Sequence, residues 1–559
     1  MSEGFERILK DIGSFGRKQI EVFVIVNLCD LMTGWTILIP IFIGAQPHWE
    51  CPALNNTVPW SEWSNTTTVP DWDQGNKSMS RVDACTPDNG VCQGIKYTSE
   101  FTSIVTEWNL VCALDEISDI VTTIQMAGIF FGALVISQLS DAFGRKPVWF
   151  ATMTVNSIVG FCNAFAPRWE IYAAMRFFNG MCAGGLLIVS YVWPIEFVGA
   201  KWRVVNGAVG FWQVGNMLLA LLAYFIRDWK TLVMVTTPIP TVLVWFLWRF
   251  LPESPRWLAM HGKEQEAEKV LELIARVNKK PTPNFEAFRK YLEDEKRKGT
   301  TTGKYSYWDL FRTPLLTRHT LVLMFAWFVY GATYYGLSLN VKHLPGDIYL
   351  NAVLLSSVEV PALAFVVIFS NKLGRRLTMF VTMLIGGLAT FSVLFIGLAG
   401  KLEELGTVVT VLAMVGKLGV TSAWNVGYIY TAELFPTVIR SIGSGAASMA
   451  GRIGGVVAPQ FTYLDKVSKE LPFIVFGVLG LAAAFLGLTL PETKDHHLPD
   501  NVPEWTWCRK GKNKEDSRVE ISIVGHTPGR SQSTVTLVRA ASIDENMDVG
   551  LSMDDVVKE

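Results

Sequence analysis

Long apolar segments recur along this chain, and polar stretches of variable length separate them. An apolar run of about 20 residues matches the thickness of a bilayer's hydrocarbon core and is typical of a transmembrane helix. The first run is too long, and is followed by too much membrane sequence, to be a cleaved signal peptide. The pattern therefore predicts an all-α membrane protein with twelve transmembrane helices, at residues 20–43, 119–139, 148–167, 171–194, 204–226, 231–251, 318–340, 348–370, 377–397, 405–430, 438–462 and 470–490.

Positive charge predicts how these helices are oriented, because cytoplasmic loops are enriched in lysine and arginine. Arg145 and Lys146, the segment 256–318 and the run from Lys372 to Arg376 all fall on one side of the predicted membrane. Both termini are therefore predicted to be cytoplasmic. The predicted divisions are a cytoplasmic N-terminus (1–19), a first six-helix bundle (20–251) with an extracellular loop (44–118), a cytoplasmic helical insert (252–317), a second six-helix bundle (318–490) and a disordered cytoplasmic tail (491–559).

The loop 44–118 has the chemistry of an extracellular segment. Four of the eight cysteines of the chain lie in it, and an even number suits two disulfides in an oxidising compartment. These are Cys51, Cys85, Cys92 and Cys112, whose pairing the sequence leaves open. The loop also contains three N-x-[ST] sequons, which predict glycosylation, at Asn55, Asn65 and Asn76.

Composition narrows the classes of function. The 559-residue chain is 50% hydrophobic and has a net charge of -1, so nothing points to binding of nucleic acid. Its seven histidines fall in predicted loops, helix ends or the tail, without a cluster of metal ligands or a nucleophile beside a base. We therefore expect no enzyme activity, no cofactor and no metal.

The two halves of the chain repeat short motifs at offsets of 230, 237 and 239 residues. The pairs are SDAFGRK (140–146) with SNKLGRR (370–376), EFVGAKWR (196–203) with ELFPTVIR (433–440), and LPESPRW (251–257) with LPET (490–493). Such a six-plus-six duplication is typical of alternating-access carriers, which hold the substrate between the halves. We expect the charged residues of these motifs to join the bundles when the cytoplasmic side is shut: Asp141, Arg145, Glu196, Arg203, Arg375, Glu433 and Arg440.

These motifs, with PESPRWL (252–258) and WNLVC (108–112), resemble those of the organic ion transporters of the major facilitator superfamily. The resemblance covers nearly all of 1–495, and it implies the twelve-helix fold of that superfamily and transport of a small organic ion. The segments 334–362 and 416–437 are most similar to the carnitine and organic-zwitterion branch. Ser137 in place of a glycine, and Asn371 in place of an acidic residue, depart from the family pattern.

Arg452 interrupts the predicted eleventh helix, in the segment GSGAASMAGRIGGVVAPQF. An unpaired charge at the centre of a bilayer costs at least about 2.5–3.5 kcal/mol. Ser444, Ser448 and Arg452 recur every fourth residue beside a stripe of small residues, which predicts a polar face on a water-filled cavity. Arg452 then meets a negatively charged substrate; the alternative is a buried ion pair with Glu359. In the family that the chain resembles, cation-selective members carry aspartate at the position of Arg452, whereas the anion and carnitine branches carry arginine.

Aromatic residues recur on one face of the predicted seventh helix, at Trp327, Tyr330 and Tyr334. Aromatic faces attract quaternary ammonium groups, although ordinary packing is the alternative. Gln213 matches a polar cavity position of the family that the chain resembles. The predicted substrate-binding residues are Gln213, Trp327, Tyr334, Glu359, Trp424, Asn425, Tyr428 and Arg452.

The expected function is alternating-access transport of a carnitine-like zwitterion or an organic anion across the plasma membrane. The alternatives are an organic cation transporter of the same fold and a non-transporting receptor. The expected partners are the substrate and the lipid bilayer, with the chain acting as a monomer. Asp30 and Arg176 are further charges within predicted helices, and the sequence leaves open whether a coupling ion, sodium or a proton, drives transport.

Overall fold

The computed structural model describes residues 3–47, 49–50, 68–69, 79–80, 96–111, 114–199, 202, 211–286, 288–289, 306–402, 404–436 and 439–494. The chain forms two compact units, Met1–Trp507 and Cys508–Glu559, and the described residues belong to the first. Several predicted residues therefore lie outside the description: Cys51, Cys85, Cys92, Cys112, Asn55, Asn65, Asn76 and Arg203.

The first half of the fold is a group of helices built from the predicted apolar runs. We call it the first half throughout. It consists of α2 (Arg17–Leu38), α3 (Pro40–Ile43), α7 (Ile117–Phe143), α8 (Arg145–Asn163), α9 (Trp169–Ile195), α11 (Trp212–Phe225), α12 (Trp229–Thr236), α13 (Pro238–Trp245) and the 3-10 helix η3 (Phe246–Phe250). Within it, α9 packs against α2, α7 and α8.

The second half is a similar group near the C-terminal end of the described chain. It consists of α17 (Pro314–Leu339), η5 (Asn340–His343), α18 (Ile348–Ser357), α19 (Glu359–Leu373), α20 (Arg375–Phe391), α21 (Val393–Leu398), α22 (Gly406–Leu434), α23 (Arg440–Thr462), η6 (Tyr463–Lys466) and α24 (Leu471–Gly487). Here α17 packs against α23, and α20 packs against α22 and α24.

Within the described residues, every predicted transmembrane run corresponds to one helix or to consecutive helices. Four runs are divided, and two of the divisions fall at Pro40 and Pro238, where the missing backbone N–H interrupts the helix. In the part of the chain that the structure describes, eight helical segments are long and apolar enough to cross a membrane. The shorter helices α11 and α24 are also apolar. The fold is therefore that of an all-helical membrane protein with short strands outside the bundles.

Small residues set the close packing of α23 on α17, as the stripe beside Arg452 predicts. A Cβ at Gly331 would collide with the backbone of Gly451, and one at Gly454 would collide with the Phe328 carbonyl. The backbones of the two helices therefore touch, which only glycine allows at these positions. This contact fixes the position of Arg452 along the axis of α23 relative to the aromatic residues of α17.

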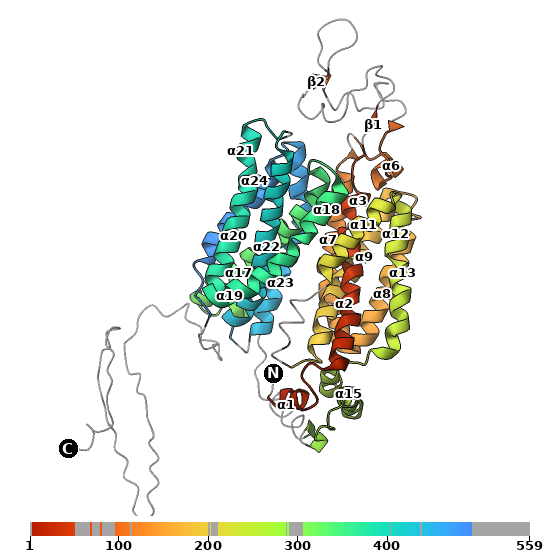
Figure 1. Ribbon diagram of the computed structural model, residues 1–559, viewed down its shortest axis with the longest axis vertical. Helices are drawn as coiled ribbons and strands as arrows, with labels where there is room; N and C mark the ends of the chain where they lie inside the picture. The colour runs from red at the N-terminus through yellow and green to blue at the C-terminus, as the bar shows by residue number, and fades with distance from the viewer. Residues whose placement is uncertain are drawn as a thin grey trace, which may run out of the picture. The chain divides into compact units, whose positions relative to one another are not determined.

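The two halves contact each other through α7 and α23, through α11 and α18, and through α3 and η5. At one end of the bundles lie α1 (Glu3–Asp11), α14 (Pro255–Met260) and α15 (Glu264–Val277), which we call the insert end (Figure 1). At the other end, the loop end, lie α6 (Ile104–Trp108) and the paired strands β1 (Trp49–Glu50) and β4 (Lys96–Tyr97) (Figure 1). The strands β2 (Thr68–Val69) and β3 (Met79–Ser80) also pair, and η4 (Tyr307–Phe311) precedes α17.

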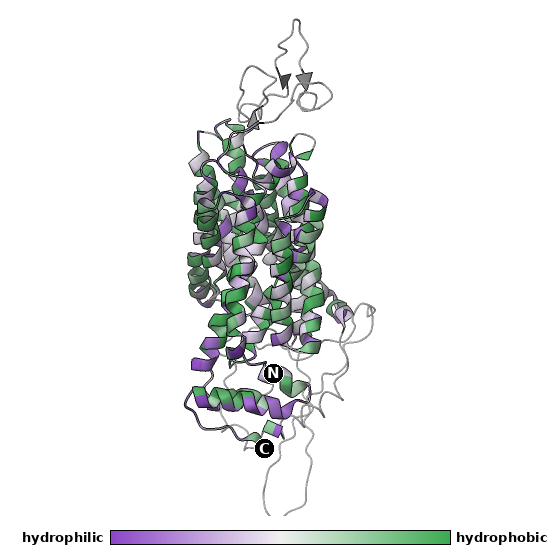
Figure 2. Ribbon diagram, turned by 90° about the vertical axis from the view of Figure 1, so that its right-hand side faces the viewer, coloured by the Kyte–Doolittle hydropathy of each residue, from purple (hydrophilic) through white to green (hydrophobic). Residues whose placement is uncertain are grey.

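Hydrophobic residues cover most of the bundle helices, whereas α15 carries a hydrophilic stripe along one side (Figure 2). Ala267, Leu271 and Ile274 are the buried face of α15. They share one buried core with Phe5 and Leu9 of α1, and this core continues into the first half at Trp149 and Trp193.

Candidate functional site

Glu359 is the centre of a buried polar cluster between the two halves. It begins α19, directly after the break at Val358, and is 2% exposed. The Tyr334 hydroxyl of α17 lies 3.0 and 3.1 Å from the two carboxylate oxygens of Glu359 and donates to the carboxylate. The side chain of Gln213 of α11, in the first half, is close enough to interact with Glu359. The structure thus brings three of the predicted substrate-binding residues together.

Lys417 is the cation that sequence reasoning missed. It lies in the interior of α22, is 2% exposed, and places its Nζ 3.4 Å from Glu359 Oε1. The same Nζ donates to the Tyr334 carbonyl at 3.2 Å and to the Ser338 hydroxyl, and lies 3.3 Å from the Tyr334 ring centroid. The ion-pair partner of Glu359 is therefore Lys417, not Arg452, which corrects the alternative considered from the sequence.

A hydrogen bond between the halves completes this cluster. Trp212 Nε1 of α11 donates to the Tyr334 hydroxyl at 2.7 Å. Since Tyr334 is held by Trp212 on one side and by Glu359 on the other, a movement of the first half acts directly on the Glu359 cluster. A cavity beside the cluster is lined by Glu359 and Lys417 together with Asn216, Ser338, Ser356 and apolar residues.

The predicted aromatic residues form a group of neighbouring rings. Trp327 lies 4.7 Å from Tyr428 and 5.7 Å from Trp424, centroid to centroid, and Trp424 lies 5.6 Å from Tyr334. Tyr428 also stacks on Tyr191 of the first half, at 6.4 Å. The amide of Asn425 donates to the Thr421 carbonyl of its own helix, and its contact with a substrate stays a prediction.

Arg452 lies in α23, is partly buried, and has no hydrogen bond or ion pair to any residue that the structure describes. Its charge acts electrostatically on Tyr335, whose ring is edge-on to Tyr334 at 5.2 Å and to Trp424 at 6.4 Å. With Glu359 paired to Lys417, Arg452 supplies the uncompensated charge among the described residues around this cluster. An arginine in that position can bind a carboxylate through two parallel hydrogen bonds.

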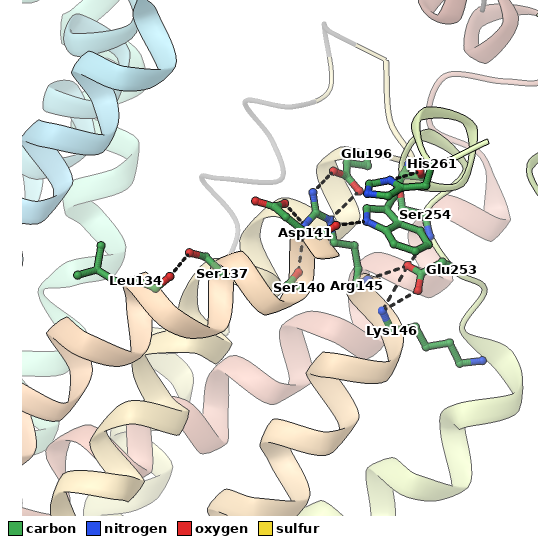
Figure 3. Close-up of polar contacts among 11 residues, drawn as sticks. Leu134, Ser137, Ser140, Asp141, Arg145, Lys146, Glu196, Glu253, Ser254 and His261 are labelled. Carbon is green, nitrogen blue, oxygen red and sulfur yellow. Dashed lines mark hydrogen bonds and ion pairs between the residues drawn. The ribbon is translucent and has the colours of Figure 1, made fainter. Parts of the chain in front are cut away.

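The repeated charged motifs lie at the insert end of each half. Figure 3 shows Arg145, at the start of α8, directed toward Asp141 and Glu196. Its Nη2 is 3.0 Å from Glu196, and its Nη1 also contacts Asp141 and donates to Ser140 at 3.1 Å. These contacts remain within the first half.

The second half repeats this arrangement with one difference. Arg375 Nη2 lies 3.0 Å from Glu433, but its Nη1 donates to the Ser370 carbonyl at 3.3 Å, because Asn371 stands where the first half has Asp141. Nε and Nη2 of Arg440 are buried without a hydrogen-bond partner among the described residues. A bridge between the halves through these residues stays a prediction for a state with the insert end shut.

Sequence reasoning assigned no role to two carboxylates of the third repeated motif, Glu253 and Glu492. Glu253 accepts a hydrogen bond from the backbone N–H of Arg145 at 3.0 Å (Figure 3). Glu492 accepts one from the backbone N–H of Arg375 at 2.8 Å. Each thereby satisfies N–H groups at the start of a helix, where negative charge is favourable. Gly144 (φ +109°) and Gly374 (φ +88°) precede these helices, and a Cβ at either would lie 2.6 Å from the carboxylate.

The pKa values of the two carboxylates are shifted in opposite directions. Burial raises the pKa of Glu253, although backbone donors act in the opposite direction. For Glu492 burial also acts to raise the pKa, but the backbone N–H groups of residues 375, 376, 493 and 494 hold it below its usual range. The repeat at an offset of 239 residues was the sequence signal that could have identified both as structural acids.

Arg176, a further predicted charge within the membrane, is not part of the central cluster. Arg176 is 3% exposed, and its Nε donates to the Tyr172 hydroxyl at 2.8 Å. The side chain of Asp30 lies outside the described residues. Among the described residues there is no group of three or more His, Cys, Asp or Glu that could hold a metal ion.

Comparison with known proteins places this geometry in a family. The family model "Sugar (and other) transporter" matches residues 74–504. The chain is 32% identical to "Organic cation transporter protein" of Drosophila melanogaster over 526 residues, covering 90% of this chain and 94% of that one. It is 32% identical over 539 residues to "Organic cation/carnitine transporter 2" of Homo sapiens, covering 91% and 95%.

A third relative agrees with this placement, and a solved structure has a similar fold. The chain is 33% identical over 533 residues to "Solute carrier family 22 member 7" of Bos taurus, covering 90% of this chain and 96% of the relative. The fold is similar to the inward-open conformation of the xylose transporter XylE from E. coli, with a TM-score of 0.60 and 18% identity over 86% of this chain and 98% of that one.

Proposed function

Because the chain belongs to the sugar (and other) transporter family, among the organic cation and carnitine transporters, we propose that it carries a small organic ion with a carboxylate group. The substrate is a carnitine-like zwitterion or an organic anion. Transport across a membrane follows from the family; the charge of the substrate is the part that we propose. The single observation that carries it is the charge of the central region.

The central region carries a formal charge of +1. Glu359 contributes one negative charge, and Lys417 and Arg452 contribute one positive charge each. Glu359 is already compensated by Lys417 and by the hydroxyl of Tyr334. An isolated cation within a membrane protein is costly unless it meets an opposite charge, so Arg452 favours a substrate with a carboxylate.

The rings of Trp327, Trp424 and Tyr428 support the zwitterion in particular. They form a group of aromatic faces and edges near Tyr335, on which the charge of Arg452 acts. A quaternary ammonium group against desolvated aromatic faces gains about 2 kcal/mol or more. A molecule with a carboxylate at one end and an ammonium group at the other could use both features.

A second candidate is transport of simple organic cations, which the name of one relative mentions. The observation in its favour is the acid Glu359 among aromatic rings. Binding of a simple cation would require Glu359 to release Lys417 and pair with the substrate. Lys417 and Arg452 would then both be unpaired cations in the same region. For this reason we favour the carboxylate-bearing substrate.

We further propose that the loop end faces the outside of the cell and that the chain acts as a monomer in the plasma membrane. The excess of lysine and arginine at the insert end supports this orientation. Uptake into proteoliposomes of carnitine, betaine, a dicarboxylate and tetraethylammonium, with and without sodium and with an imposed proton gradient, tests the substrate and the coupling ion together. Uptake of tetraethylammonium alone would contradict the proposal.

A further inference from the structure

A set of charged residues at the loop end joins the two halves. Lys342 of η5 places its Nζ 2.6 Å from Asp119 Oδ1 in the first turn of α7. Lys466 of η6 places its Nζ 2.5 Å from Asp115 Oδ1, an ion pair by distance although not aligned as a hydrogen bond. In both pairs the acid belongs to the first half and the lysine to the second, so an opening of the loop end must separate them.

A third acid in the same place belongs to the second half. Asp465 of η6 accepts through Oδ2 from His343 Nδ1 at 2.7 Å. Its other oxygen, Oδ1, is buried without a hydrogen-bond partner among the described residues. A buried carboxylate oxygen left without a donor is destabilised, and such groups need an explanation.

The lysines next to Asp465 supply that explanation. Burial acts to raise the pKa of Asp465, but His343, Lys342 and Lys466 together hold it below its usual range. The carboxylate is therefore already in the field of both lysines while they are paired to Asp119 and Asp115. In the closed arrangement two lysines face two acids of the first half, and Asp465 is not needed to balance them.

We propose that Asp465 is the partner that Lys342 and Lys466 take when the loop end opens. Opening removes Asp115 and Asp119 with the first half and would leave two lysines unpaired at a partly buried edge. Asp465 moves with the lysines, since all three belong to the second half, and its unpaired Oδ1 receives one of them. Asp465 is a positioning residue that stabilises the open state, whereas Asp119 stabilises the closed one.

The two acids therefore have opposite effects on the same equilibrium. If Asp465 were only another member of the closed cluster, removing its charge would loosen the loop end, as removal of Asp119 does. If it is the partner of the lysines in the open state, removing its charge favours closure. The opposite effects of Asp119 and Asp465 on opening of the loop end go beyond the proposed function, because they do not depend on which substrate is carried.

Ala352 of α18 can report on opening, because it is 5% exposed and lines the cavity beside Glu359 together with Phe42 and Leu219 of the first half. The experiment measures the rate at which a bulky maleimide labels Ala352→Cys in purified, detergent-solubilised full-length protein without substrate. Cys162 is exposed and free, so the background carries Cys162→Ser, and the same protein without Ala352→Cys gives the blank.

We expect Asp119→Asn to raise the labelling rate by about threefold to tenfold, and Asp465→Asn to lower it by a similar factor. Changes of about this size are typical when one of two directly interacting residues is removed. Asp465→Glu keeps the charge and should label at the rate of the parent. In a background that carries Lys342→Met and Lys466→Met, Asp465→Asn should leave the labelling rate unchanged, because the two ammonium groups that Asp465 would bind are absent. Asp465→Ser repeats the test if the asparagine variant does not fold.

A labelling rate that rises or stays unchanged on Asp465→Asn would overturn the proposal. An effect of Asp465→Asn that persists without the two lysines would overturn it as well. Because no substrate is added, a failure here leaves the proposed substrate class untouched, and a failure of the uptake experiments leaves this test valid.

Discussion

Lys417 Nζ lies 3.4 Å from Glu359 Oε1, and both side chains are almost completely buried between α22 and α19. The two charges compensate each other in a place where either one alone would be costly. This pair decides how much charge the central region presents to a substrate, because it leaves Arg452 as the surplus.

Replacing Lys417 by methionine should change both the stability and the charge preference of the protein. The substitution leaves Glu359 buried without its cation, which costs about 3–5 kcal/mol for a pair of this kind. It also lowers the charge of the central region from +1 to zero, so carnitine uptake should fall relative to tetraethylammonium uptake. Thermal unfolding of the purified protein and the uptake ratio in proteoliposomes measure the two effects.

The double variant Lys417→Met/Glu359→Gln is the matched control. It removes both charges, restores the net charge of +1 through Arg452, and should recover much of the lost stability and of the uptake ratio. A double variant that is as unstable as Lys417→Met would show that the two side chains do not act as a pair.

Arg452 can be tested by changing its charge and its shape separately. Arg452→Asp should abolish uptake of carboxylate-bearing substrates, and tetraethylammonium uptake should increase, because the region then has a charge of -1. Arg452→Lys keeps the charge but loses the planar fork that binds both carboxylate oxygens, so it should transport poorly. Both measurements need equal amounts of protein at the membrane. Undiminished carnitine uptake by Arg452→Asp would show that Arg452 has only a structural role.

Most of the fold follows from the sequence, because runs of apolar residues near 20 in number have few alternatives to membrane-spanning helices. The repeated motifs marked Arg145, Arg375, Glu196 and Glu433 as residues that join the bundles, but the sequence did not predict that each arginine pairs with the glutamate of its own half. Lys417 was missed although it is a charge inside a predicted span, a signal that was available. Its pairing with Glu359 was not predictable, because it depends on how α19 and α22 pack in space.

The ion pairs at the loop end could not be predicted from the sequence for the same reason. Asp119 and Lys342 are far apart in the sequence, and both lie near predicted helix ends, where a charge is ordinarily solvated. Only the packing of α7 against the second half brings them to 2.6 Å. Trp212 is likewise not among the predicted site residues, and its bond to Tyr334 requires α11 to face α17.

The segment 44–118 should be outside the cell and glycosylated. We expect glycosidase treatment to increase the gel mobility of protein from the cell surface, and removal of Asn55, Asn65 and Asn76 together by glutamine to abolish that shift. Two disulfides among Cys51, Cys85, Cys92 and Cys112 should protect these thiols from alkylation until a reductant is added. Unchanged mobility of surface-expressed wild-type protein would contradict the orientation.

Arg145 should affect the speed of the transport cycle more than the binding of substrate. Its contacts to Glu196 and Asp141 are at the insert end, at the start of α8, whereas the proposed substrate region lies around Glu359 and Arg452. Arg145→Ala therefore leaves the binding residues in place but removes the cation that holds the ends of α7, α8 and α9 together.

The measurement separates the two quantities. The affinity of purified Arg145→Ala for a transported substrate should stay within about threefold of wild type, below the tenfold that 1.4 kcal/mol produces. The initial rate of exchange per molecule of protein should fall by about tenfold or more, as expected when a conformational step limits turnover. Arg145→Lys, which keeps the charge toward Glu196, is the control and should retain more of the rate. Lost affinity with an unchanged exchange rate would instead place Arg145 in the substrate path and not at a gate, since residues of a gate act on the movement of the halves and only weakly on the bound substrate.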